Sequence, residues 1–149
     1  MFTIDKLSLS QAKELSKWKY EDEYSIYNYP NWDIMIRDKW AITDVIVRKN
    51  EFRGVFIDNQ LIGYFRLFTC KDKLFIGLGM KPSFCGQGNG YKFMHSILKY
   101  YLCVYPDKIL NLKVRTFNER AIKLYKKLGF RIVNNTLDDE FIYMEYDAP

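Results

Sequence analysis

Three glycines on alternate positions, Gly86, Gly88 and Gly90, place the strongest constraint on what this chain can fold into. They lie in the stretch FCGQGNG, between an apolar run at 73–80 and an amphipathic run that starts at Tyr91. Residues without side chains leave the backbone open to close approach by another group. A strand, a glycine loop and a helix N-terminus form a ready anion site, because unpaired amides and the positive end of the helix dipole point at the loop. A tight structural turn is the alternative interpretation.

The spacing of these glycines excludes two common phosphate-binding motifs. A P-loop requires GxxxxGK[ST], and the chain has no Gly-Lys-Ser/Thr. A dinucleotide-binding fold requires GxGxxG, but the sixth position counted from Gly86 is Tyr91. That fold also needs an early βαβ unit, whereas three strands of antiparallel appearance precede this loop. The ligand is therefore expected to carry phosphate but to belong to another class.

The first half of the chain predicts a strand, a helix and a β-meander. Ser8 and Gln11 have the spacing of a capping box, so a helix should follow the strand-like residues 2–8. Residues 21–50 predict a long loop-and-helix segment with a short helix at Ile34–Trp40. The meander strands are expected at Phe52–Ile57, Leu61–Phe68 and Lys73–Met80, with a hairpin turn at Asp58-Asn59-Gln60.

The second half of the chain predicts two helices and three strands. The helix after the glycine loop should bury Phe93, Met94, Ile97, Leu98, Tyr101 and Leu102. The second helix should run from Asn118 to Leu128, end at Gly129, and turn Ala121, Leu124, Tyr125 and Leu128 to one side. The expected strands are Ile109–Val114, Arg131–Asn135 and Phe141–Tyr146, the last two paired around Asp138-Asp139. Together the elements predict an α/β (α+β) fold in a single domain, 1–149.

Two motifs together resemble the GNAT family of acetyl-CoA-dependent acetyltransferases. In that family a strand ending in V-x-P leads into [RQ]-x-x-G-x-[GA] and a helix. The chain has Met80-Lys81-Pro82, followed by Cys85-Gly86-Gln87-Gly88-Asn89-Gly90. The family's N-x-x-A-x-x-x-Y-x-x-x-G-F is matched, with every spacing kept, by Asn118, Ala121, Tyr125, Gly129 and Phe130. The resemblance implies a GNAT fold, in which helices flank a mixed, mostly antiparallel central sheet.

The resemblance also assigns roles to residues. Backbone amides of the loop would hold the pyrophosphate of CoA, with Cys85, Gly86, Gln87, Gly88, Asn89, Gly90 and Tyr91 as the loop residues. Leu78, Gly79 and Met80 would pair with the pantetheine arm, and Gly79 would remove a side chain from the approach. Asn118 would contact the same arm as well as cap its helix. Tyr125 would protonate the leaving sulfur as a general acid, with a core tyrosine as the alternative.

Cys85 departs from the family pattern, which usually has Arg or Gln at this position. GNAT transfer goes directly to the amine, so Cys85 is interpreted as a small residue whose backbone serves the loop rather than as a nucleophile. The general base stays open. Lys113 stands where some members have a glutamate, and the strand 74–80 has no carboxylate. The acids at 21–23 and a water chain are alternative candidates for the base. His95 is expected to lie too far around its helix to serve as the base.

Composition and charge limit the classes of partner, site and compartment that suit this chain. The net charge of +5 favours an anionic partner, and a phosphate-bearing cofactor explains it because the basic residues are scattered. Three cysteines without CxxC spacing and a single histidine argue against disulfides and a metal site, and for a reducing cytoplasm. No window of the chain has the length of a membrane span, and residues 1–7 do not read as a secretion signal.

The sequence thus predicts a cytoplasmic N-acetyltransferase that moves an acetyl group from acetyl-CoA to a primary amine of a small molecule or peptide. The acids and aromatic residues of 20–32, within a segment similar to the W-x-Y…Y-x-x-Y-[DN] pattern of some bacterial members, would suit a cationic amine. The alternative is a non-catalytic acyl-CoA-binding or sensing module. A nucleic-acid-binding domain is the third hypothesis and has little support from the scattered charge. The many aromatic residues are compatible with a homodimer.

Overall fold

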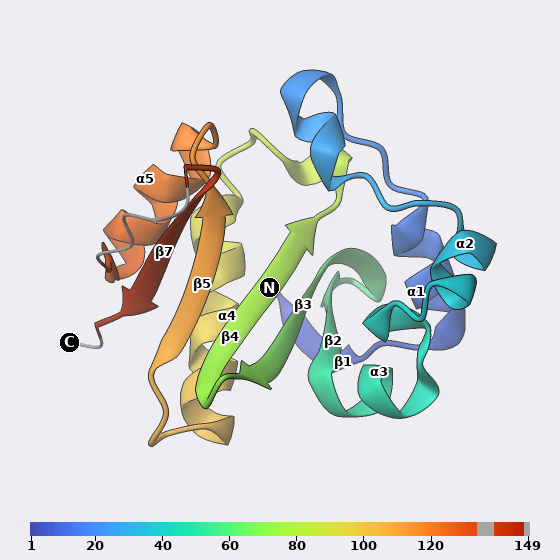
Figure 1. The fold of residues 1–149 in the computed structure, drawn as a ribbon, viewed down its shortest axis with the longest axis horizontal. Coiled ribbons are helices and arrows are strands. Elements are labelled where there is room, and N and C mark those ends of the chain that lie inside the picture. The colour runs from blue at the N-terminus through green and yellow to red at the C-terminus, as the bar shows by residue number, and fades with distance from the viewer. Residues whose placement is uncertain (134–138, 148–149) are drawn as a thin grey trace. The chain divides into compact units, whose positions relative to one another are not determined.

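The computed structural model describes residues 1–133 and 139–147, and these fall into two compact units. The first unit comprises Met1–Arg66 and Leu78–Asn89, and the second comprises Leu67–Gly77 and Gly90–Pro149. Two long strands, β3 and β4, which are labelled in Figure 1, contribute residues to both units.

The strands of the described residues form one mixed sheet in the order β1-β2-β3-β4-β5-β7-β6. Strands β4 and β5 are parallel, whereas the pairs β1–β2, β2–β3, β5–β7 and β6–β7 are antiparallel. This confirms the predicted mixed, mostly antiparallel sheet. The strands are β1 (Thr3–Lys6), β2 (Phe52–Ile57), β3 (Gln60–Cys70), β4 (Lys73–Met80), β5 (Leu110–Arg115), β6 (Phe130–Ile132) and β7 (Phe141–Tyr146).

Tight turns join the three meander strands. Asp58 and Asn59 connect β2 to β3 with φ angles of 48° and 65°. Lys71 and Asp72 connect β3 to β4 with φ angles of 51° and 64°. Positive φ at both central residues is the mark of a type I′ turn, whose twist matches that of the flanking strands. The predicted hairpin at residues 58–60 is confirmed, and the bounds of β2 and β4 agree with the sequence expectation.

Helix α1 (Leu9–Ser16) begins with the predicted capping box. The Ser8 hydroxyl accepts a hydrogen bond from the Gln11 backbone amide at 3.1 Å, and the Gln11 side chain accepts one from the Ser8 amide at 2.9 Å. The helix buries Ala12 and Leu15, which joins it to the core of the first unit. That core consists of Leu7, Ala12, Leu15, Trp18, Met35, Ile42, Phe52, Phe56 and Leu61.

The segment between α1 and β2 is more regular than predicted. Helix α2 spans Trp32–Arg37 instead of the expected Ile34–Trp40, because the Asn31 side chain caps it earlier by accepting from the Asp33 amide. A further helix, α3 (Val45–Glu51), was not predicted, and the Asp44 carboxylate caps it. The segment also contains two short 3₁₀ helices, η1 (Asp22–Tyr27) and η2 (Ala41–Thr43).

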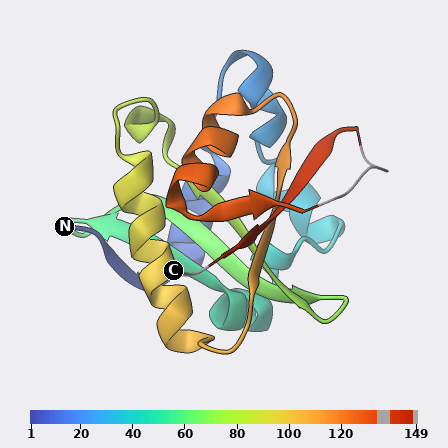
Figure 2. The ribbon, with the colours of Figure 1, turned by 90° about the vertical axis from the view of Figure 1, so that its left-hand side faces the viewer.

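In the second unit, helices α4 (Gly90–Val104) and α5 (Glu119–Leu128) lie side by side (Figure 2). Helix α4 buries Phe93, Met94, Ile97, Leu98 and Tyr101 as expected. Leu102 was wrongly placed on this face: it is 41% exposed, one position past the buried stripe. Helix α5 buries Ile122 and Tyr125, and the first of these was not predicted.

The ends of the second unit agree with the predicted helix cap and strand pair. Gly129 ends α5 with φ at 112°, a left-handed conformation that glycine adopts without strain. Strand β6 then starts one residue earlier than expected and pairs with β7 in antiparallel register. The expected extension of β6 to Asn135, and Asp138 of the predicted turn, lie outside the described residues. None of the helices in the described part of the chain has the length and apolar character needed to cross a membrane.

Candidate functional site

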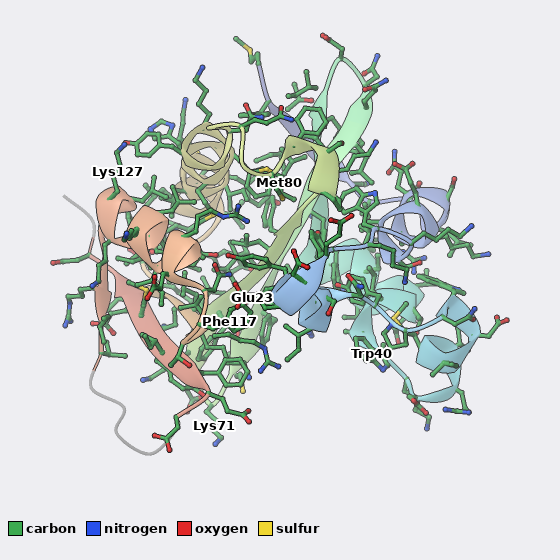
Figure 3. The ribbon with its side chains drawn as sticks, turned by 90° about the horizontal axis from the view of Figure 1, so that it is seen from above. Glu23, Trp40, Lys71, Met80, Phe117 and Lys127 are labelled. Carbon is green, nitrogen blue, oxygen red and sulfur yellow. The ribbon has the colours of Figure 1, made fainter. Side chains whose placement is uncertain are left out.

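The end of β4, where pantetheine pairing was predicted, is held by an aromatic side chain of the first unit. The Tyr20 hydroxyl donates a hydrogen bond to the Met80 carbonyl oxygen at 2.7 Å. Within the described residues, the β4–β5 ladder comprises Leu74 and Phe75 of β4, so the strand continues beyond that ladder to Met80. Leu78, Gly79 and Met80 all lie in this continuation, and Figure 3 labels Met80 at the end of the strand.

Gly79 packs against a tyrosine of the neighbouring strand. A Cβ atom at this position would lie 2.5 Å from a ring carbon of Tyr64. The Tyr64 hydroxyl is in turn hydrogen-bonded to the Tyr29 hydroxyl at 2.7 Å. The packing of Tyr64 therefore requires a glycine at position 79, which the sequence did not reveal. The family resemblance predicts a second reason for this glycine, the close approach of a ligand.

Tyr20, Tyr29 and Tyr64 form a network of half-buried phenols that sequence reasoning missed as a unit. Burial raises the pKa of each phenol above the ordinary value of 10.0, and in Tyr20 the nearby Cys85 thiol raises it further. The tyrosine-rich stretch 18–28 was the available signal. Its interpretation as a segment that suits a cationic amine did not anticipate that Tyr20 would hold the backbone of Met80, sixty residues away.

The sign of φ alternates along the glycine loop. Gly86 and Gly88 have φ angles of 73° and 76°, whereas Gln87 between them has a negative φ. Alternation of this kind turns successive amides toward a common side, as in the backbone nests that bind anions. Open space surrounds the position that a Gly88 Cβ would take. The loop is exposed at Gly86, Gln87 and Gly88, so these amides are accessible.

Polar side chains of the loop fold back onto its own backbone. The Gln87 amide group donates to the Ser83 carbonyl at 2.8 Å, and the Asn89 amide group donates to the Phe84 carbonyl at 3.3 Å. The half-buried Cys85 thiol lies 3.7 Å from the Met80 carbonyl oxygen and 3.6 Å from that of Lys81. These contacts stabilise the loop through its own side chains. They do not cover Gly86 and Gly88, which are exposed.

The second unit contributes the helix N-terminus that follows the loop. Gly90 begins α4, and a Cβ atom there would lie 3.1 Å from the Leu124 side chain of α5. The glycine therefore lets α4 approach α5 closely. The Tyr91 ring is 41% exposed, stacks with His95 and lies 5.3 Å from the Lys127 ammonium. Figure 3 labels Lys127 near the C-terminal end of α5.

Asn118 and Tyr125 lie at the start and in the body of α5. The Asn118 side chain accepts a hydrogen bond from the Ala121 amide at 3.2 Å, which confirms its predicted role as N-cap. Tyr125 is 8% exposed, and its ring meets the Phe130 ring edge-on with centroids 5.7 Å apart. Seven residues separate Asn118 from Tyr125, so the two belong to the same side of the helix.

The acids at 21–23, which the sequence offered as one alternative for the general base, are exposed. Glu21, Asp22 and Glu23 all lie on the surface at η1, and Figure 3 labels Glu23 there. His95 and Lys113 are exposed in the second unit. An open cavity of about 680 Å³ in the first unit is a separate feature, since no predicted site residue lines it; its lining is Leu9, Ser10, Lys13, Glu14, Lys17, Trp18 and Lys81.

The phenol network predicts a loss of stability at alkaline pH. Because the folded state keeps these tyrosines protonated while the unfolded chain ionises near pH 10.0, the free energy of unfolding is retained below that pH and falls as the pH rises above it. Each retained proton steepens this fall by at most about 1.4 kcal/mol per pH unit. Denaturant melts of Tyr64→Phe should show a shallower fall between pH 10 and 12 than the wild type. Tyr27→Phe, which removes an exposed phenol, is the control, and an equal effect of both changes would contradict the prediction.

Residues 9–130 match the model of the acetyltransferase (GNAT) family. Because this match covers most of the chain, the protein belongs to the GNAT acetyltransferase family. A relative from Bacillus subtilis (strain 168), the SPbeta prophage-derived uncharacterized N-acetyltransferase YokL, is 27% identical over 89 residues. The alignment covers 56% of this chain and 50% of the relative, so the chain matches half the length of that protein.

Solved structures share the fold. The N-acetyltransferase PseH of Campylobacter jejuni, in complex with acetyl coenzyme A, has a TM-score of 0.71 at 21% identity, covering 100% of both chains. The PaiA N-acetyltransferase of Thermoplasma acidophilum, in complex with coenzyme A, has a TM-score of 0.70 at 23% identity over 99% of each chain. A spermidine N-acetyltransferase chimera of Vibrio cholerae SpeG and hSSAT reaches 0.74 at 18% identity, covering 97% of this chain and 94% of that one. The predicted GNAT fold is confirmed.

Proposed function

We propose that this protein is an N-acetyltransferase that moves an acetyl group from acetyl-CoA directly to the primary amine of a small molecule or peptide. The observation that carries the proposal is the loop at 85–89, whose left-handed Gly86 and Gly88 come immediately before the N-terminus of α4. Accessible amides and the helix dipole favour the pyrophosphate of CoA. Family membership and the CoA complexes of PseH and PaiA support the same donor.

The remaining site residues take the following roles in the proposal. In the first unit, Leu78, Gly79 and Met80 pair with the pantetheine arm, on a strand end that Tyr20 and Tyr64 hold in place. In the second unit, Gly90 and Tyr91 extend the pyrophosphate site, and Asn118 contacts the arm. An amide of the β4 end would face the thioester oxygen.

Tyr125 is the proposed general acid. Bound acetyl-CoA supplies an activated acetyl group, whose carbonyl carbon forms a bond to the amine nitrogen as the carbon–sulfur bond breaks. The Tyr125 phenol gives its proton to the departing sulfur, and the amine gives up a proton to solvent or to a surface carboxylate. The packed position of the Tyr125 ring against Phe130 supports this role, because a buried ring holds its phenol in a defined place.

The proposal includes a small-molecule amine as one class of acceptor and the cytoplasm as the compartment. Spermidine, in the name of one structural neighbour, is a small-molecule amine, and it supports a small amine as one class of acceptor. Within the described residues, Cys70, Cys85 and Cys103 form no disulfide, which fits a reducing compartment such as the cytoplasm.

The direct test is CoA release from acetyl-CoA by the purified protein, measured with a thiol reagent across polyamines, amino acids, aminoglycosides and peptides. We expect saturable release with at least one class of amine and an acetylated product by mass spectrometry. Saturable CoA binding without release from any amine would instead support the acyl-CoA-sensing alternative. One observation favours that alternative: β5 carries no acidic residue, and Lys113 is exposed on it.

A further inference from the structure

Strand β5 of the second unit presents two cations around a single aromatic ring. Lys113 and Arg115 are two residues apart, so their side chains leave the same face of the sheet. The Lys113 ammonium lies 4.4 Å from the centre of the Phe141 ring, and the Arg115 guanidinium carbon lies 4.7 Å from it. The register of β5 and β7 places Phe141 directly opposite Arg115, which explains how one ring meets both charges.

Across residues 1–133 and 139–147, neither Lys113 nor Arg115 forms an ion pair. Glu145, on the paired strand β7, is engaged by Arg131 instead. The two positive charges lie closer together than the Debye length of roughly 10 Å at 0.1 M salt, so each raises the energy of the other.

The ring fixes these cations without cancelling their charge. A cation–π contact orients an ammonium or guanidinium group at little cost in hydration, and leaves its outer N–H donors available. Lys113 is exposed and Arg115 is half-buried, so an incoming ligand can reach both. Buried Asn111, next on this face, turns its amide donors to the carbonyls of Leu74 and Ile109 and supplies no negative charge.

The cation pair belongs to the same short stretch as a proposed CoA contact. The Asn118 backbone amide donates to the Arg115 carbonyl at 2.9 Å, which closes the turn between β5 and α5. A displacement of Arg115 would therefore be transmitted to the N-cap of α5. Lys113, Arg115 and Asn118 all lie in the second unit and in one continuous stretch of the chain, which fixes their separation.

We propose that Lys113, Arg115 and Phe141 form an anion subsite that selects acceptor amines carrying a carboxylate or a phosphate. This inference rests on the proposed acetyltransferase function and names its substrate class. Arginine binds such groups through paired N–H donors, and lysine adds a point charge. The acidic residues at 21–23 had suggested a cationic acceptor, whereas the β5 cations, both placed against the Phe141 ring, favour an anionic group on the acceptor.

Matched pairs of amines test the selection. Lysine is compared with cadaverine and O-phosphoethanolamine with ethanolamine, each as acceptor in the CoA-release assay. The acidic member should have the higher kcat/KM by about tenfold to a hundredfold, the range of a charge-assisted hydrogen bond. Lys113→Met combined with Arg115→Met should abolish that preference. Lys123→Met combined with Lys126→Met removes the same charge from exposed positions of α5 and should leave the preference intact.

A binding measurement separates this proposal from the proposed function. O-phosphoethanolamine is titrated into the protein, with and without CoA, and the backbone amides of residues 113–118 are followed by NMR. Binding that the double variant loses would support the subsite even if no amine released CoA. Equal kcat/KM for the amines with and without the acidic group would overturn the subsite and leave the proposed acetyltransferase function unaffected. A double variant that loses affinity for CoA, but keeps its acceptor preference, would assign the cations to the phosphates of CoA and overturn the proposal too.

Discussion

Replacing Tyr125 with phenylalanine should lower turnover about 100-fold or more, the lower end of what a positioned general acid contributes. In free energy this is an increase of about 2.7 kcal/mol in the barrier. The reason is that the change removes one hydroxyl and keeps the ring that packs edge-on against Phe130. The dissociation constant for CoA should stay the same, because the pyrophosphate is proposed to bind at 86–91. Single-turnover kinetics and equilibrium CoA binding on the same preparation give both quantities.

The control for this prediction is Tyr105→Phe, which removes a phenol from the same unit at a position with no proposed role. Its turnover should match the wild type. If Tyr125→Phe retained wild-type turnover across pH 6 to 9 with an unchanged melting temperature, Tyr125 would be a packing residue. A loss of turnover that merely followed a loss of stability would lead to the same conclusion.

Gly79→Ala should cost about 1–3 kcal/mol of stability, the usual range for overpacking, and should weaken the use of acetyl-CoA. The added Cβ would lie 2.5 Å from a ring carbon of Tyr64, closer than any real Cβ contact allows. Tyr64 has little freedom to move away, because its hydroxyl is hydrogen-bonded to Tyr29. The backbone of β4 must therefore shift at the position proposed to pair with pantetheine, and the KM for acetyl-CoA should rise.

The chain offers a matched control for this change two residues earlier. Gly77 lies on the same strand and face of the sheet, and apart from its two chain neighbours no atom of the described residues lies within 4 Å of the position that its Cβ would take. Gly77→Ala should therefore leave the melting temperature unchanged or raise it slightly, since alanine restricts the unfolded chain. Chemical denaturation of both variants compares them directly, and equal stabilities would show that Tyr64 yields to the added methyl group.

Strands and helices whose ends carry local signals could be predicted from the sequence. The bounds of β2 and β4 agreed because Asp58-Asn59 and Lys71-Asp72 supply short turns between apolar runs. Helix α5 agreed because Asn118 begins it and Gly129 ends it. The same local spacing allowed the family resemblance to be seen, since it depends on intervals within single elements.

Features set by contacts between distant parts of the chain could not be predicted. The phenol network joins Tyr20, Tyr29 and Tyr64, and no local pattern indicates that Tyr64 packs on Gly79. The cation pair needed the β5–β7 register, which places Phe141 opposite Arg115. Helix α3 was missed because its cap, Asp44, stands in a segment with weak periodicity.

The two type I′ turns have a consequence for the order in which the chain folds. Strands β2, β3 and β4 are joined by two-residue loops, so their pairing closes short loops and costs little chain entropy. Strands β4 and β5 are parallel, and the whole of α4 lies between them in the sequence. Their pairing therefore closes a much longer loop, which costs more chain entropy. We therefore expect the meander to be structured in the folding transition state and the β4–β5 pair to form late. Core truncations in β2 and β3 should accordingly slow refolding, whereas truncations in β5 should chiefly accelerate unfolding.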